Sequence, residues 1–232
     1  YECVCTAERR AYANLVNELP ISEVPLYLNP YREWIGAQIR GDFYGYVAPG
    51  NPELAAGLAW RDAALSHVKN GIYGEMMVAA MLSMALDSED VSDVVRAGIS
   101  EIPRQCRLAE AANDVLAWHR QHSDWEVAFQ EVMRKYGHYH PVHTINNACI
   151  VLLALLYGQG DFTRAVGIAV MCGLDTDCNG ATVGSICGAL TGAQNIPSNW
   201  TWPLNNTLLS AVSGSTTCRI TDLASRTKRL WK

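Results

Sequence analysis

Apolar residues recur at helical spacing along most of the chain and predict that helices form its core. Ala11, Leu15 and Leu19 fall on one stripe of a helix that begins at Thr6. Few segments alternate apolar and polar residues between turn signals, which is the pattern of a half-buried strand. We therefore expect an all-α fold, a compact bundle of about ten helices in a single domain over residues 1–232.

Capping residues and prolines indicate where these helices start and end. Asn51-Pro52 is typical of a helix start, Asn70-Gly71 of a helix end, and Ser88 or Asp90 caps a later helix. The segment 41–50, rich in glycine and aromatic residues, is expected to be a loop. Helices are expected over residues 6–19, 30–40, 51–69, 72–86, 90–102, 105–122, 124–136, 142–157, 161–171, 179–193 and 221–230.

The charge and the lengths of the apolar runs argue against a nucleic acid partner and against a membrane-spanning helix. Charged residues make up 18% of the 232 residues and the net charge is −5, so no basic surplus exists to neutralise phosphates. We expect no nucleic acid partner. The chain also lacks an apolar run of about 18 residues, so we expect no membrane-spanning helix.

Eight cysteines and a histidine cluster raise the question of a zinc site or disulfides. Cys149, Cys172 and Cys187 lie in apolar helical runs, and the Cys3-x-Cys5 pair has no second pair at zinc-ligand spacing. We expect reduced thiols and a cytoplasmic protein. His138, His140 and His143 could also suggest zinc, but no cysteine lies near them, so a loop role is preferred.

The strongest chemical signal is the run Asp175-Thr176-Asp177, between two predicted helices. Two carboxylates two residues apart in a non-helical turn can converge on one hard cation. The alternative is that Asp177 is only the N-cap of the next helix. We favour the metal site because Gly180, Gly184, Gly188 and Gly192 follow on one helix stripe, which predicts that another backbone passes close behind the turn.

Three stretches of sequence resemble the ADP-ribosylglycohydrolase (dinitrogenase-reductase-activating glycohydrolase) family. Residues 173–192, GLDTDCNGATVGSICGALTG, resemble its C-terminal signature, residues 29–82 its middle section, and residues 140–173 the segment before its metal turn. The resemblance covers most of the chain from residue 29 onward. It implies one or two Mg²⁺ or Mn²⁺ ions and a substrate that is ADP-ribose or carries it.

The resemblance also implies roles for individual residues. Asp175 and Asp177 match metal carboxylates, and Cys178 stands where many members have a threonine that also contacts the metal, which weakens that ligand. Asp177 is the expected catalytic base within this chain; otherwise the base lies in a missing part. The expected substrate contacts are Gly36, Ala37, Gln38 and Arg40, in a loop whose backbone N–H groups hold the pyrophosphate or ribose, and His67, in a Ser-His pair near the ADP-ribose.

Some of these residues have structural alternatives. His67 could equally be a cation that caps a helix end. Glu75 is expected to be an acid in a first helical turn. The adjacent amides Asn146 and Asn147 enter an apolar helix, where we expect them to orient a loop or to touch substrate.

The family's other half-site, a Thr-Asp-Asp run with an upstream Glu, has no counterpart in this sequence. The one adjacent acidic pair, Glu89-Asp90, caps a surface helix. We therefore expect the chain to be the C-terminal part of a longer fold, without its N-terminal helices, and to associate with that missing segment or another chain.

Three hypotheses about function follow. The first is metal-dependent hydrolysis of the glycosidic bond that links ADP-ribose to a protein side chain or small acceptor. The second is an inactive relative that binds ADP-ribose or a partner. The third is a hydrolase of another N- or O-riboside.

Overall fold

The protein is an all-α bundle, as the helical pattern predicted. The computed structural model describes residues 4–231. One short two-stranded sheet is the only sheet in this part of the chain. The α-helices are α1 (Thr6–Val16), α2 (Asp42–Tyr46), α3 (Pro52–Ala63), α4 (Asn70–Ala85), α5 (Val91–Ser100), α6 (Arg107–Gln121), α7 (Trp125–Tyr136), α8 (Thr144–Gly158), α9 (Phe162–Met171), α10 (Thr176–Thr191), α11 (Ser198–Thr201) and α12 (Ile220–Lys228). Three 3₁₀ turns, η1 (Gln38–Arg40), η2 (Ala193–Asn195) and η3 (Trp202–Leu204), join them.

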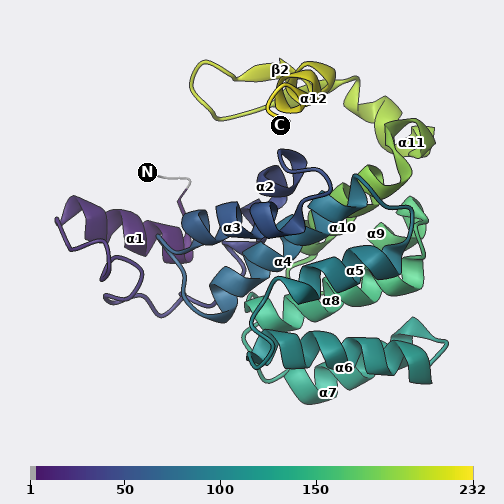
Figure 1. Ribbon diagram of the computed structural model, residues 1–232, viewed down its shortest axis with the longest axis horizontal. Helices are drawn as coiled ribbons and strands as arrows, with labels where there is room; N and C mark the ends of the chain where they lie inside the picture. The colour runs from purple at the N-terminus through teal and green to yellow at the C-terminus, as the bar shows by residue number, and fades with distance from the viewer. Residues whose placement is uncertain (1–3, 232) are drawn as a thin grey trace.

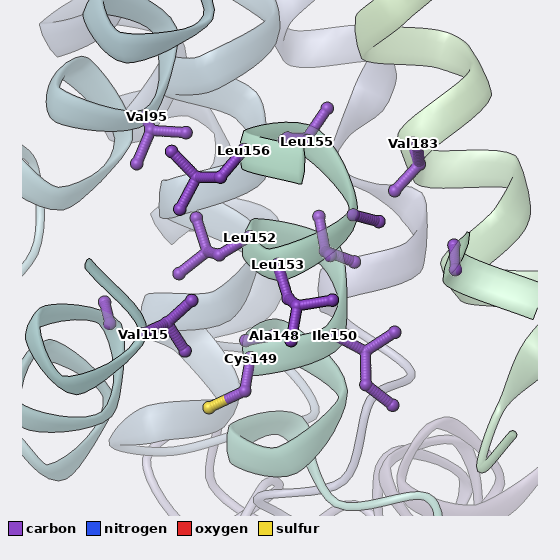
Figure 2. Close-up of a cluster of buried hydrophobic side chains, with 14 of the residues drawn as sticks. Val95, Val115, Ala148, Cys149, Ile150, Leu152, Leu153, Leu155, Leu156 and Val183 are labelled. Atoms are coloured by element: carbon purple, nitrogen blue, oxygen red, sulfur yellow. The ribbon is translucent and has the colours of Figure 1, made fainter. Parts of the chain in front are cut away.

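Helix α8 is the centre of the hydrophobic core. Every residue from Thr144 to Gly158 is buried, so the helix needs neighbours on all sides. Helices α4, α5, α6, α7, α9 and α10 pack around it. Figure 2 shows side chains of α8 beside Val95 of α5, Val115 of α6 and Val183 of α10. Because α10 packs directly on this core, the turn that begins it is held on a rigid base.

Helix α4 joins the core to the segments that carry the substrate-loop residues. It packs against α2, α3 and α5 as well as against α8 and α10. Two glycines permit this close packing. A Cβ on Gly45 of α2 would lie 2.7 Å from the carbonyl oxygen of Ala79, and a Cβ on Gly98 of α5 would lie 2.9 Å from that of Met77.

The C-terminal segment forms an arm over one end of the bundle (Figure 1). After η2, α11 and η3, strands β1 (Thr207–Leu209) and β2 (Thr217–Arg219) pair antiparallel, and α12 follows. The arm is mostly exposed, and the indole N–H of Trp231 donates to the carbonyl of Tyr46 at 2.8 Å. No helix in the described residues is both long and apolar enough to cross a membrane.

Two local predictions between residues 30 and 50 were wrong. The helix expected over residues 30–40 is instead a series of turns that ends in η1, because Ile35 N–H bonds Val142 O at 2.9 Å and Trp34 forms a β-bridge with His143. The loop expected over residues 41–50 contains the short helix α2, which is held against α4. In both segments, contacts distant in sequence override the local pattern.

The predicted close backbone behind the glycine stripe of α10 was also wrong. A Cβ on Gly180 would meet a methyl group of Val170 at 3.1 Å, and one on Gly184 would meet the Phe162 ring at 3.5 Å. A Cβ on Gly192 would meet nothing within 4 Å, and that residue ends the helix at φ 79°. Side chains of α9 and of Ile196, not backbone, therefore lie against this stripe. The α3 helix also ends at Ala63, six residues before the expected Lys69.

Candidate functional site

The turn between α9 and α10 brings the predicted metal ligands together. Gly173 and Leu174 both have positive φ, 74° and 60°, which reverses the chain before α10 begins. Ligand atoms of Asp175, Asp177 and Cys178 all lie within 4.8 Å of one another. Within the described residues, no other group of three histidine, cysteine or acidic side chains converges this closely.

The carboxylates of this turn are not used to cap the helix. Asp175, not Asp177, is the N-cap residue of α10, and its side chain makes no capping hydrogen bond. The alternative of Asp177 as a simple N-cap is therefore wrong. Asp177 lies exposed in the first helical turn, where the helix dipole also favours negative charge.

The donor set suits a hard cation better than a soft one. Burial raises the pKa of the Asp175 carboxyl, and Asp177 raises it further, although a contact with Cys178 opposes this. Burial, followed by the nearby Asp175 and Asp177, raises the pKa of the Cys178 thiol to about 12. Carboxylate oxygens are the ligands that Mg²⁺ and Mn²⁺ prefer, whereas sulfur is a soft ligand that suits other metals better. The two carboxylates thus fit the implied cation, and Cys178 adds little.

The metal turn opens into the same cleft as part of the predicted substrate loop. This cleft has a volume of about 520 Å³, and Glu8, Trp34, Gly36, Val142 and Asp175 are among the residues that line it. The volume is within the usual range for small-molecule sites. Glu8, Trp34 and Val142 were not predicted from the sequence, because nothing in their local pattern distinguishes them from ordinary helix and loop residues.

The other predicted substrate residues lie behind the cleft surface. The side chains of Ala37, Gln38 and His67 are fully buried, so contact with a substrate would require a movement of η1 or of the segment after α3. Their substrate role, like that of Gly36, stays a prediction.

Arg40 is the centre of a polar cluster beneath the loop. Its guanidinium pairs with Glu8 and Asp62, donates to Gly36 O at 3.1 Å and to Ser66 Oγ at 3.0 Å. A Glu75 oxygen lies 4.0 Å from Nη2. We name these residues together with His67 the Arg40 cluster. Because internal partners occupy the guanidinium, a substrate phosphate would have to displace them, and substrate binding by Arg40 stays a prediction.

His67 and Glu75 are uncharged at neutral pH. Burial and the Arg40 charge lower the pKa of His67 to about 3, and its Nδ1 lies 2.8 Å from Ser66 Oγ. Helix α3 also ends at Ala63, four residues before His67, so the alternative of His67 as a cation that caps a helix end is wrong. Glu75 lies in the second turn of α4, not the first, and is fully buried. Burial raises the pKa of Glu75 to about 9 against the opposing Arg40 charge.

The histidine cluster forms aromatic stacks. His140 stacks on Trp34 with centroids 4.3 Å apart, and both His138 and His143 contact the ring of Tyr139. The preferred loop role agrees with this arrangement. All seven cysteines in the described residues are free, and Cys3 lies outside them.

The fold and the acidic turn define a helical protein with a site that a divalent cation would suit. The chain matches the ADP-ribosylglycohydrolase family over residues 4–232, nearly its whole length. It belongs to this family, whose members are glycosidases that handle ADP-ribose or ADP-ribosylated substrates. No curated protein matches the chain.

Proposed function

We propose that this protein hydrolyses the glycosidic bond between ADP-ribose and a protein side chain or small acceptor, with Mg²⁺ or Mn²⁺ at Asp175 and Asp177. The observation that carries the proposal is that these two carboxylates converge and leave the helix uncapped, and that Asp175 borders a cleft of about 520 Å³. A divalent cation bound there would supply positive charge that orients ribose hydroxyls and water.

The two carboxylates have different surroundings, which supports different roles. Asp175 borders the cleft and is half-buried, so it suits a fixed metal ligand. Asp177 is exposed, so its carboxylate is the one that water reaches most freely. We assign Asp177 as the base that accepts a proton from the attacking water, and Gly36 as the residue whose backbone faces the substrate.

Hydrolysis assays test this proposal directly. The full chain is incubated with ADP-ribosylated arginine or serine peptides, with Mg²⁺ or with EDTA, and free ADP-ribose is measured. We expect release that depends on the metal and that Asp175→Asn abolishes. Asp161→Asn is the matched control, because Asp161 caps α9 and lies outside the cleft. Absence of release from both peptides by the wild-type chain would contradict the proposal.

A second candidate is an ADP-ribose-binding relative without catalytic activity. The observation that favours it is the number of ligand side chains, because only three acidic, cysteine or histidine side chains converge in the described residues, whereas such cations take six or more oxygen ligands. Calorimetry separates the two candidates: binding of ADP-ribose without turnover supports the second, and absence of binding rejects it. Under either candidate, we propose that another segment or chain completes the site and that the protein is cytoplasmic.

A further inference from the structure

Two adjacent buried amides begin α8, and only one of them reaches the metal turn. Asn146 donates to His140 O at 3.1 Å and thus serves the preceding loop. The Oδ1 atom of Asn147 instead accepts from the backbone N–H of Asp175 at 3.1 Å and from Asn179 Nδ2 at 2.8 Å. Asn147 is fully buried, so these bonds are shielded from water.

The other end of the same amide holds the loop that contributes Val142 to the lining of the cleft. Asn147 Nδ2 donates to Pro141 O and His143 O, each at 2.8 Å. The loop before α8 is in turn bonded to the segment that precedes the predicted substrate loop. Ile35 N–H donates to Val142 O, and Thr144 Oγ1 donates to Trp34 O at 3.0 Å. One side chain therefore connects Asp175 with the segment that leads to Gly36.

We propose that Asn147 is a positioning residue that sets the metal turn against the substrate loop. This inference rests on the proposed function for its consequence, but its geometry does not depend on that function. Only a primary amide can accept two hydrogen bonds at one end and donate two at the other. The bonds also fix the amide's orientation, since a flip would place its NH₂ group against two donors.

The consequence is that Asn147 controls cation affinity without touching the cation. If Asp175 loses the bond to its N–H, the turn with two positive-φ residues is free to change conformation, and the Asp175 carboxylate leaves its position beside Asp177. Partners that hold a ligand from behind typically change metal affinity by about 10–100-fold.

Titration of Mn²⁺ into the full chain, followed by electron paramagnetic resonance, tests the inference. For Asn147→Ala we expect the Mn²⁺ affinity to fall about tenfold or more. Asn14→Ala is the matched control: Asn14 is also buried and its Nδ2 donates to two carbonyls at 2.8 Å, but it lies on α1. Equal Mn²⁺ affinities in the two variants would overturn the inference.

Two additions keep the test decisive. Asn179→Ala removes one of the two bonds to Asn147 Oδ1 and leaves the loop bonds intact, so it serves if Asn147→Ala does not fold. For Asn179→Ala we expect the Mn²⁺ affinity to fall about two- to tenfold.

Hydrogen exchange at the Asp175 amide gives a readout independent of metal. Faster exchange in Asn179→Ala than in Asn14→Ala supports the positioning role even if the wild-type chain binds no Mn²⁺, which would refute only the proposed function. Unchanged exchange overturns the inference.

Discussion

The metal turn and the Arg40 cluster each gather carboxylates, but they balance the charge differently. In the Arg40 cluster, a guanidinium pairs with Glu8 and Asp62, and burial keeps Glu75 protonated. At the metal turn, Asp175 and Asp177 face each other without a basic partner among the described ion pairs. The first arrangement stabilises the fold, whereas the second leaves negative charge for a ligand. The comparison predicts that substitutions in the Arg40 cluster lower the stability of the fold, whereas substitutions in the metal turn lower the affinity for a cation.

The largest effect on stability is expected for Arg40→Met. The substitution leaves the Glu8 and Asp62 carboxylates unpaired beside buried Glu75. We expect the free energy of unfolding to drop by about 2–4 kcal/mol, below the loss for a fully buried pair because these side chains are partly exposed. Urea denaturation measures it. A drop as small as that of the surface variant Arg96→Met would show that the cluster is not a stabilising centre.

Glu75→Gln is expected to change how stability depends on pH. The pKa of Glu75 is raised from 4.5 to about 9, so between these values the folded state keeps a proton that the unfolded state has lost. Stability therefore falls as pH rises, by up to about 1.4 kcal/mol per pH unit. The amide cannot ionise, so the stability of the variant should depend less on pH. At about pH 8 the variant should be more stable than wild type.

Thermal unfolding of both proteins between about pH 7.5 and 8.5 measures this effect as the difference between the two pH profiles, because groups other than Glu75, such as His67 and the buried thiols, contribute equally to both. Parallel pH profiles for Glu75→Gln and wild type would mean that Glu75 is ionised in the folded protein.

A smaller loss is expected for Ser66→Ala. The hydroxyl joins Arg40 to the ring of His67, at 3.0 and 2.8 Å, and its removal leaves the partly buried guanidinium and the buried ring each short of one bond. We expect about 1–2 kcal/mol of destabilisation in urea. Ser66→Thr, which keeps the hydroxyl, is the control and should recover most of the loss; equal losses would assign the effect to packing instead.

The smallest effect on stability is expected at the metal turn. Asp177→Asn removes one of two facing carboxylates, so without metal the unfolding free energy should change by no more than about 0.5 kcal/mol. With Mn²⁺ present, the wild type should gain stability and the variant should not, because a ligand stabilises only the state that binds it. A metal-independent loss comparable to that of Ser66→Ala would place Asp177 in the fold instead of the site.

The sequence predicted most helices well and the segment before α2 poorly, for one physical reason. Where a helix is periodic and capped locally, as at Asn51 and Asp90, the needed information lies within a few residues. Residues 33–36 instead take their conformation from a β-bridge to His143, more than a hundred residues away. No local pattern encodes such a partner.

The candidate site divides in the same way. The convergence of Asp175 and Asp177 could be predicted because the two carboxylates are neighbours in sequence, but the expected helix start near Asn179 was wrong, since α10 begins at Thr176 and includes Asp177. The burial of Gln38 and His67 and the engagement of Arg40 by Glu8 and Asp62 could not, because these elements meet only after folding. Glu75 was misassigned for this reason: its spacing in the sequence resembles that of an acid at a helix start, but α4 begins five residues earlier.

The most direct test of the central claim is calorimetric titration of Mn²⁺ into the wild-type chain and into Asp177→Asn, each with Mg²⁺ as competitor. The account predicts saturable binding to the wild type that Mg²⁺ competes for and that the substitution removes. Identical titration curves for the two proteins would contradict the assignment of this turn as a metal site.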